Sequence, residues 1–431
     1  MRLKAGLALL VASASVAAAC QVQPAPTAAP TPRSYPAVQT LYEGYVRDKK
    51  MPGIVGAIGE GNAPPTFIAA GALADEAGAG KADADSLWRI YSMTKPITGI
   101  AAMMLVEDGK LKLDQPIGDF IPAFKQMRVL TDPANSLASR PATKPITVRH
   151  LLTHTAGLGY TIITKGPLLK EYERLGILPF TTNAALELQV GPARPKSLEE
   201  FAARVATLPL IAEPGTRWSY SIGLDLMGRV IEVASGMSFE RFLQTRMFGP
   251  LKMRSTYWTV PKSEVGRLAT GYVWAGERRI PIDPAANSAF LNPPPFPYGG
   301  AGLVSSARDY DRFLAMLAND GSLDGARVMK PATVRLAMSN LLPAGVTFGG
   351  VAGSTGGAGG ADMGFGAGGS VYLRDVPGGA SKGTYGWGGA AGTIAWVDPV
   401  RKLRGTVMVN YIPSDKWPIR ADTVKAVYGG R

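Results

Sequence analysis

Runs of strand-like residues lie near both ends of the chain, and helical patterns fill its middle. Near the N-terminus, two apolar runs at residues 54–58 and 66–70 flank a Gly-Asn turn signal and predict a hairpin. Three further strand-like runs lie near the C-terminus, at residues 370–373, 393–397 and 405–411. Because isolated strands leave backbone groups unpaired, we expect one sheet assembled from both ends of the chain.

The helical patterns between these runs predict an inserted domain. Apolar residues recur at helical spacing after Ser92 and in residues 197–206, 223–234, 239–248 and 307–318. The predicted fold class is therefore α/β, an α+β sandwich with an inserted all-helical domain. Residues 37–91 and 299–431 would form the α/β domain and residues 92–298 the mainly helical one, with a site in the cleft between them.

The first 36 residues are predicted to lie outside the folded part. A short basic segment and an apolar run at residues 5–16 precede Cys20, so residues 1–19 are predicted to be a signal peptide for export. Residues 20–36 are rich in Pro and Ala and are predicted to be a tether. The segment resembles a bacterial lipoprotein signal, although Ala17 stands where a larger apolar residue is usual.

That resemblance implies lipidation of Cys20, attachment to a membrane, and a place in the periplasm or at the outer membrane. Ordinary cleavage, which would leave Cys20 as an unpaired thiol, is the alternative. Cys20 is the only cysteine of the chain, so an intrachain disulfide is excluded.

The composition is that of a globular protein and argues against nucleic acid as a partner. Hydrophobic residues make up 46% of the chain and charged residues 18%, while the formal net charge is +13. The basic residues are scattered, with no long run and no recognisable nucleic-acid-binding module. We attribute the positive charge to solubility or to contact with an anionic surface.

Ser92 and Lys95 form the only Ser-x-x-Lys pair in the chain. Residues three apart on a helix lie on one face, so the lysine amine can take the proton from the serine hydroxyl. Pro96 fits only in the first turn of a helix, which places Ser92 at the positive end of the helix dipole. For so short a motif, a solvated helix start is the alternative reading.

Histidine is not the evident base for this serine. The only histidines, His150 and His154, lie four residues apart on one predicted helix, residues 148–154. No Asp or Glu nearby completes a metal site, so we favour a structural role, and we predict neither a metal nor another cofactor. If Ser92 is a nucleophile, Lys95 is its most economical base.

A tyrosine can assist such a lysine as a proton relay. Tyr220 lies in a turn-rich segment just before the predicted helix at residues 223–234. Spacing alone does not distinguish it among the 15 tyrosines of the chain.

Five segments resemble the serine β-lactamase and penicillin-binding-protein superfamily, and most of all the family VIII carboxylesterases, which share the class C β-lactamase fold. The resemblance extends over nearly the whole chain from about Ala37 onward. The segments are YSMTKP from Tyr91, HLLTHTAGL from His150, EPGT from Glu213 leading to Tyr220-Ser221, GGAGLVSS from Gly299 and WGGAAGT from Trp387. The resemblance implies a β-lactamase/transpeptidase-like fold, whose antiparallel sheet is built from both chain ends.

The resemblance also implies roles for the residues at matching positions. Ser92 would be the nucleophile, Lys95 its general base, and Tyr220 the group that protonates the leaving group and helps to activate water. The oxyanion hole would consist of the backbone N–H groups of Ser92 and Ala390, the latter on an edge strand after Trp387-Gly388-Gly389. Two fixed donors of this kind typically supply several kcal/mol of transition-state stabilisation.

Two departures from the pattern bear on the substrate. β-Lactamases and D-alanyl peptidases have Asn two residues after the tyrosine, where this chain has Ile222, and a Lys-Thr-Gly-type box where it has Trp387-Gly388-Gly389. Both replacements resemble family VIII esterases and suit an uncharged ester. Ile222, Trp387, Gly388 and Gly389 are therefore predicted substrate-binding residues, together with Phe365 in a Gly-rich stretch, residues 340–369, that we predict to be a loop.

Three functions remain open at this point. The first is an exported serine carboxylesterase that acts on a small-molecule ester through an acyl-enzyme on Ser92. The second is a β-lactamase or D-alanyl-D-alanine carboxypeptidase-like amide hydrolase. The third is a lipid-tethered binding protein without turnover, against which the complete Ser92, Lys95 and Tyr220 set argues.

Overall fold

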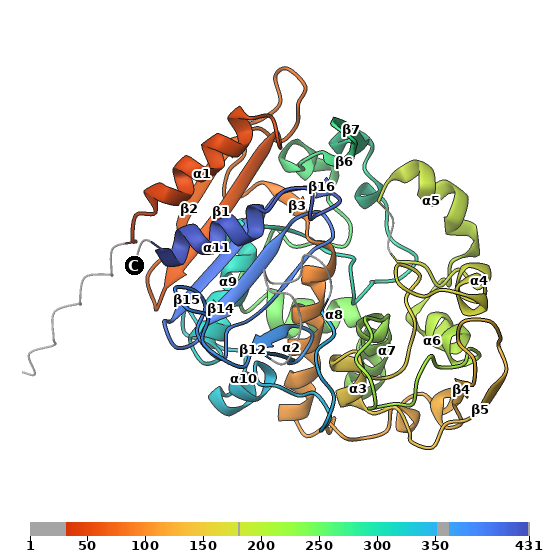
Figure 1. Ribbon diagram of the computed structural model, residues 1–431. Coiled ribbons are helices and arrows are strands. Elements are labelled where there is room, and N and C mark those ends of the chain that lie inside the picture. The colour runs from red at the N-terminus through yellow and green to blue at the C-terminus, as the bar shows by residue number, and fades with distance from the viewer. Residues whose placement is uncertain (1–31, 180–181, 351–361, 430–431) are drawn as a thin grey trace, which may run out of the picture.

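The computed structural model describes residues 32–179, 182–350 and 362–429 (Figure 1). In these ranges the largest sheet is seven-stranded and antiparallel throughout, with the order β11-β12-β13-β14-β15-β1-β2. Its strands are β1 Gly53–Glu60, β2 Thr66–Gly71, β11 Met363–Phe365, β12 Ser370–Tyr372, β13 Tyr385–Gly388, β14 Ile394–Asp398 and β15 Leu403–Met408. The predicted signal peptide, Cys20 and most of the predicted tether lie outside the described residues.

The sheet joins the two ends of the chain, as the sequence predicts. β1 pairs with β2 as a hairpin and, on its other side, with β15 in a register that runs from Val55↔Met408 to Glu60↔Leu403. Every residue of β1 except Glu60 is buried, so both faces of the strand are covered. Gly56 permits this packing, because a Cβ there would lie 2.7 Å from the hydroxyl oxygen of Tyr42.

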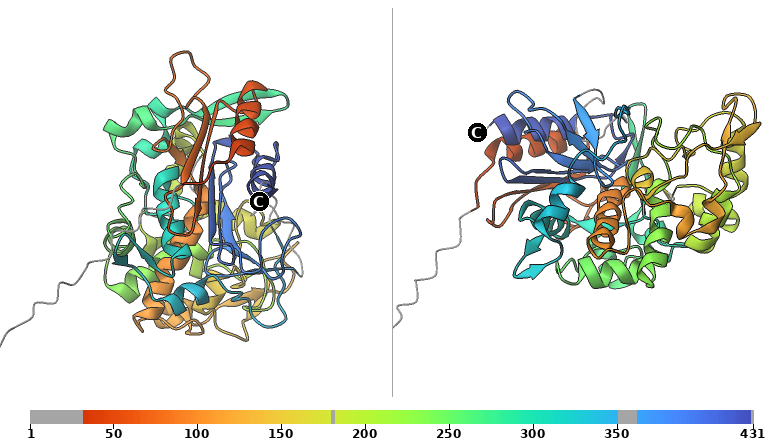
Figure 2. Two further views of the ribbon diagram at one scale, coloured as in Figure 1. Left: turned by 90° about the vertical axis from the view of Figure 1, so that its left-hand side faces the viewer. Right: turned by 90° about the horizontal axis from the view of Figure 1, so that it is seen from below.

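Helices cover both faces of the sheet (Figures 1 and 2). On one face, α1, Pro36–Arg47, and α11, Ile419–Gly429, pack against each other and share an apolar cluster with the strands. On the other face, α9, Ala307–Ala318, packs against β1, β14 and β15. Next to α9, the helix α2, Thr94–Glu107, contacts β13 and α10, Pro331–Ala337, and is buried from Thr94 to Leu105.

The helical region packs on the far side of α2 from the sheet (Figure 1). Its helices are α3 Val148–Leu152, α4 Pro167–Arg174, α5 Ala184–Val190, α6 Leu198–Ala206, α7 Gly223–Ser235 and α8 Phe239–Leu243, which continues as the π-helix Gln244–Phe248. The caps follow the sequence signals: Thr147, Ser197 and Ser238 each accept a hydrogen bond from the third backbone N–H of their helix.

Smaller strands complete the structure. They are β3 Leu87–Arg89 with β8 Val304–Ser306, β4 Arg128–Leu130 with β5 Ser139–Pro141, β9 Ser322–Leu323 with β10 Ala326–Arg327, and β16 Tyr411–Ile412 beside the hairpin β6 Gly271–Ala275 and β7 Arg278–Asp283. The region predicted to be mainly helical thus also contains two hairpins, while the division into domains stays a prediction. Among the described residues, no helix is long and apolar enough to cross a membrane.

Two predictions about the C-terminal strands are wrong. Residues 340–369 are predicted to be a loop, but Met363–Phe365 forms β11 at the end of the sheet. The Met-Gly-Phe sequence is too short to show strand periodicity, and its central residue, Gly364, carries no side chain. A Cβ at Gly364 would lie 2.5 Å from the Asn340 side chain. β13 is consequently inside the sheet and not at its edge. Of the β13 residues, however, only Tyr385 and Gly386 pair with β12. Residues 351–361 lie outside the described part of the chain.

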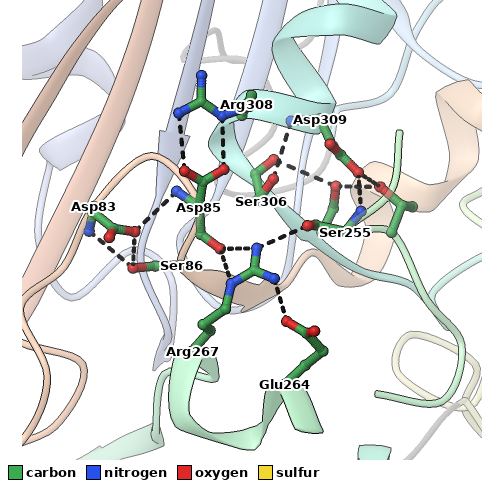
Figure 3. Close-up of polar contacts among 11 residues, drawn as sticks. Asp83, Asp85, Ser86, Ser255, Glu264, Arg267, Ser306, Arg308 and Asp309 are labelled. Atoms are coloured by element: carbon green, nitrogen blue, oxygen red, sulfur yellow. Dashed lines mark hydrogen bonds and ion pairs between the residues drawn. The ribbon is translucent and has the colours of Figure 1, made fainter. Parts of the chain in front are cut away.

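A polar network fastens the segment that enters β3 (Figure 3). The carboxylate of Asp85 accepts two hydrogen bonds from Arg308 of α9, at 2.7 and 2.9 Å, and this contact lowers the pKa of Asp85. The backbone carbonyl of Asp85 accepts from the Arg267 guanidinium, which also donates to Ser255. The network therefore ties the chain ahead of β3 to α9 and to the loop that precedes β6.

The last residue of β3, Arg89, is a buried cation. Its Nε donates to Asp283 Oδ2 at 2.5 Å, and its Nη2 donates to the Asp283 carbonyl and to Ser288 Oγ, both at 3.0 Å. Both charged side chains are 1% exposed. Because Ser92 follows only three residues later, this ion pair holds the start of the Ser92 segment against β7.

We predict that Asp283→Ala lowers the free energy of unfolding by about 3–5 kcal/mol, because it leaves the Arg89 charge buried without its carboxylate. The matched control is Asp85→Ala, which removes an ion pair whose two side chains are each 48% exposed and should cost at most about 1 kcal/mol. Urea denaturation of both variants measures the difference, and equal losses would contradict it.

Candidate active site

Ser92 lies in a short 3₁₀ helix, Tyr91–Met93, that leads directly into α2. Tyr91, immediately before it, has a φ of 41°, a left-handed conformation that a bulky residue adopts only when its surroundings hold it. Those surroundings include the ring of Phe290, 6.1 Å away between centroids. Pro96 falls in the first turn of α2, as predicted. The backbone therefore fixes Ser92 at the start of a buried helix.

Lys95 lies beside Ser92, with its Nζ 3.2 Å from Ser92 Oγ. The lysine is fully buried, and its Nζ donates a second hydrogen bond to the carbonyl oxygen of Gly300 at 2.6 Å. The same nitrogen lies 4.6 Å from the ring centroid of Tyr220 and 5.6 Å from that of Tyr160. Ring faces attract a positive charge, so these contacts would stabilise an ammonium that forms when the amine accepts a proton.

A buried carboxylate supports the Gly300 contact. The backbone N–H of Gly300 donates to Asp225 Oδ1 at 2.8 Å, and a Cβ on Gly300 would lie 2.6 Å from the other carboxylate oxygen. Asp225 lies on α7 and is 3% exposed. Burial raises the pKa of Asp225, while the charge of Lys95 acts to lower it. Asp225 therefore positions the carbonyl that holds Lys95.

Tyr220 completes the arrangement around Ser92. Its hydroxyl donates to Ser92 Oγ at 2.9 Å and accepts a longer hydrogen bond, 3.4 Å, from the indole Nε1–H of Trp387. Ser92 Oγ is thus within hydrogen-bond distance of both Lys95 and Tyr220. The three groups come from the 3₁₀ helix, from α2 and from the loop before α7. The structure brings the predicted residues together, and their roles are taken up below.

An aromatic cluster surrounds the Tyr220 ring. The side chains of Tyr160, Trp218, Phe348, Phe365, Trp387 and His154 form it together with Tyr220. Phe365 is fully buried and lies 5.2 Å from Trp387 between ring centroids. Ile222 is 2% exposed and precedes α7, where its N–H donates to Gly159. That these residues bind substrate stays a prediction.

The backbone N–H groups predicted to form the oxyanion hole belong to Ser92, in the 3₁₀ helix, and to Ala390, in the turn after β13. Gly389 packs against the segment before Ser92, because a Cβ there would lie 2.3 Å from the carbonyl oxygen of Ile90. Gly388 and Gly389 are both buried, so the strand passes close to that segment. Within the described part of the chain, neither the Ser92 nor the Ala390 N–H has a hydrogen-bond partner. Both groups are free to bind an oxygen atom.

The histidines differ from their prediction. α3 ends at Leu152, and His154 follows it with a φ of 56°, so the two histidines do not share a helix. The four-residue spacing of the histidines predicted one helix, but the chain turns between Leu152 and Gly157, before a second helical turn can form. His150 Nδ1 instead accepts the backbone N–H of Thr147 at 3.2 Å, as part of a capping box at the start of α3.

His154 lies against Tyr220 but is not placed to act as a base. Its Nδ1 accepts the backbone N–H of Ser221 at 3.2 Å and lies 3.0 Å from Ser221 Oγ. That acceptor role assigns the ring proton to Nε2, which is buried without a partner among the described residues. Burial, with the Lys95 charge, lowers the pKa of His154 well below its usual value, so the ring is neutral. No group of three or more potential metal ligands occurs in the described ranges.

Several residues of the site escaped the sequence analysis. Gly300 belongs to a segment that the resemblance includes, but nothing in the sequence points to its carbonyl. Asp225 stands among the apolar residues of α7, and a carboxylate inside an apolar pattern is a usable signal of a buried contact. Trp218 lies two residues before Tyr220, the spacing that places extended side chains on one face.

The chain is similar to several known proteins. A family model described as Beta-lactamase matches residues 38–428. Protein Rv1367c of Mycobacterium tuberculosis is 34% identical over 351 residues, 80% of this chain and 81% of that protein. Esterase EstB of Burkholderia gladioli is 30% identical over 302 residues, 66% of this chain and 71% of that protein. The solved structure of EstCE1, described as a hydrolase with promiscuous acyltransferase activity, matches with a TM-score of 0.73 at 24% identity, covering 91% of this chain and 98% of that one.

The partly buried His150 predicts how stability depends on pH. Burial lowers the pKa of His150 to about 4, so the unfolded chain binds its proton near pH 6.5 and the folded chain only near pH 4. Stability from this group is complete above pH 6.5 and is lost as the pH falls toward 4. We expect His150→Gln, which keeps the capping box, to lose about 1–2 kcal/mol less than wild type between pH 7 and pH 5. Denaturant titrations at both pH values test this, and equal losses in the two proteins would contradict it.

Proposed function

The chain belongs to the beta-lactamase family and is a serine hydrolase, and on that premise we propose that it is a carboxylesterase for short-chain esters. Its β-lactamase-like fold, with a sheet built from both chain ends, agrees with the prediction from the sequence. The observation that carries the proposal is the position of Ser92 Oγ, 3.2 Å from Lys95 Nζ and 2.9 Å from the Tyr220 hydroxyl.

In the first half of the proposed reaction, the Lys95 amine takes the proton of Ser92 as Oγ attacks the ester carbonyl. The oxyanion that forms is bound by the backbone N–H groups of Ser92 and Ala390. The Lys95 ammonium is then stabilised by the Gly300 carbonyl and by the ring faces of Tyr160 and Tyr220. Tyr220 gives its proton to the departing alkoxide, which leaves as an alcohol, and regains a proton from the Lys95 ammonium, while Ser92 carries the acyl group.

In the second half, water replaces the alcohol. Tyr220 and Lys95 take a proton from the water as it attacks the acyl carbonyl, and the same two N–H groups bind the second oxyanion. Collapse of that intermediate returns the proton to Ser92 Oγ and releases a carboxylic acid. The base and its relay are therefore restored, and no further reactant is required.

The surroundings of Tyr220 support an ester in preference to a β-lactam or a peptide. Ile222 and Trp387 are apolar where the amide-cleaving relatives suggested by the resemblance have Asn and Lys. Both side chains are 2% exposed, and neither carries a charge that could bind a substrate carboxylate. An uncharged acyl group is desolvated in such surroundings at little cost, whereas a carboxylate is not.

We expect Ser92→Ala to lower kcat on p-nitrophenyl butyrate by more than about 10⁴-fold, and Lys95→Ala or Tyr220→Phe by about 10²–10⁴-fold. The matched control is Tyr428→Phe, which removes a buried hydroxyl that donates to Asp398 on the opposite face of the sheet and should leave kcat unchanged. A Lys95→Ala enzyme that retains most of its rate would contradict the assigned base.

The same preparations separate the alternative functions. A chromogenic cephalosporin assayed beside the ester should be opened slowly by the wild type, with a kcat/KM at least about 100-fold below that for the ester. Efficient, Ser92-dependent lactam opening would instead establish the amide hydrolase. A folded wild type with neither activity would favour the binding protein without turnover.

We further propose that the chain is exported and tethered through a lipid on Cys20, in the periplasm or at the outer membrane. Support comes from the basic, apolar and small-residue order of the first 19 residues and from the single cysteine that follows. We expect Cys20→Ala to move the esterase from the membrane fraction to the soluble fraction and to abolish incorporation of labelled palmitate. Equal membrane association of the variant would contradict lipid attachment.

A further inference from the structure

Arg420, in the first turn of α11, is a buried cation that lacks an acidic partner. It is 5% exposed, and no carboxylate in the described ranges lies within ion-pair distance of its guanidinium. Its only hydrogen bonds there go to backbone carbonyls: Nη2 donates to Gly389, and Nε donates to Gly392 at 3.2 Å. Burial lowers the pKa of Arg420 only to about 10, so the group carries its charge at neutral pH.

Both acceptors belong to the tight turn between β13 and β14. The Gly389 carbonyl also accepts the N–H of Gly392 at 3.2 Å, which closes the turn, and the Gly389 N–H donates to Thr393 at 2.8 Å. Gly392 has a φ of +92°, and a Cβ there would lie 2.7 Å from Val409. Arg420 on α11 therefore binds a turn whose backbone conformation is restricted.

The peptide group that Arg420 contacts is the one expected to act on the substrate. The carbonyl of Gly389 and the N–H of Ala390 belong to the same planar peptide unit and point in opposite directions. A cation bound to the oxygen fixes the plane of that unit and draws electron density away from its N–H, which becomes a better donor. Asp415 acts on the guanidinium through its charge but forms no ion pair with it, so part of the positive field also reaches the oxyanion.

We propose that Arg420 is a positioning residue of the oxyanion hole, orienting and polarising the Gly389–Ala390 peptide so that the Ala390 N–H binds the transition-state oxyanion. This inference rests on the proposed function, in which Ala390 is one of two donors. It assigns the C-terminal helix a part in the reaction, although Arg420 itself does not touch the substrate.

The test compares Arg420→Gln with Arg420→Lys and with Val427→Ala. Val427 is a buried residue of the same helix, 1% exposed, whose truncation weakens the packing of α11 without touching the turn. For each protein, kcat and KM are measured on p-nitrophenyl butyrate. Inhibition constants are measured for a trifluoromethyl ketone of the same acyl length, which adds to Ser92 as an oxyanion, and for the corresponding trifluoromethyl carbinol, which cannot.

We expect Arg420→Gln to lower kcat about tenfold with KM within about twofold of wild type. Its inhibition constant for the ketone should rise by a similar factor, while that for the carbinol stays constant. Arg420→Lys, which keeps a cation near the Gly389 carbonyl, should recover most of both losses. Val427→Ala should lower the melting temperature and leave the kinetic and inhibition constants unchanged.

An Arg420→Gln enzyme with wild-type kcat and ketone affinity overturns the inference, as does an equal loss of affinity for ketone and carbinol. If Arg420→Gln does not fold, Arg420→Met, which also removes the charge, decides: a weaker ketone affinity at constant carbinol affinity supports the inference, and no change overturns it. Wild-type ester cleavage that depends on Ser92 is measured first. Its absence overturns the proposed function and this inference with it, whereas an active wild type with unaffected Arg420 variants overturns the inference alone.

Discussion

The rest of the site depends on one hydrogen bond, from the buried Lys95 Nζ to the carbonyl of Gly300. Three parts of the chain meet there, because Lys95 lies on α2, Gly300 precedes β8, and Asp225 on α7 holds the N–H of Gly300. A buried amine needs such acceptors, since an unpaired one would be expelled to solvent or neutralised. Because the Gly300 carbonyl holds the Lys95 amine in place, the distance from Lys95 Nζ to Ser92 Oγ depends only on the backbone at the start of the helix.

The cations of the site are held with few direct contacts to acidic side chains. Lys95 rests on a carbonyl and two tyrosine rings, Arg420 rests on two carbonyls, and His154 is kept neutral by burial. Carbonyls and ring faces hold a cation in place without cancelling its field. Such a site attracts negative charge that develops during reaction, while its apolar walls disfavour a substrate that arrives charged.

Local signals in the sequence predicted the β1–β2 hairpin and the Ser92–Lys95 pair, because each depends on residues close together in the chain. The meeting of both chain ends followed from the order of strand-like and helical runs. What the sequence missed depends on contacts between distant segments: β11 is too short and Gly-rich to show periodicity, and the left-handed turn at His154 has no local signature. The contacts that Lys95 makes with Gly300 and Arg420 makes with Gly392 use backbone carbonyls, which leave no mark on residue identity.

In the proposed reaction, Ser92 Oγ is the atom that attacks the ester carbonyl. The most direct test is to treat the protein with a p-nitrophenyl alkylphosphonate, which transfers a phosphonyl group irreversibly to an activated serine, and to locate the adduct by peptide mass spectrometry. The account predicts one adduct per chain, on Ser92, formed in step with the loss of esterase activity. Complete loss of activity with the adduct on another residue, or with Ser92 unmodified, would contradict it.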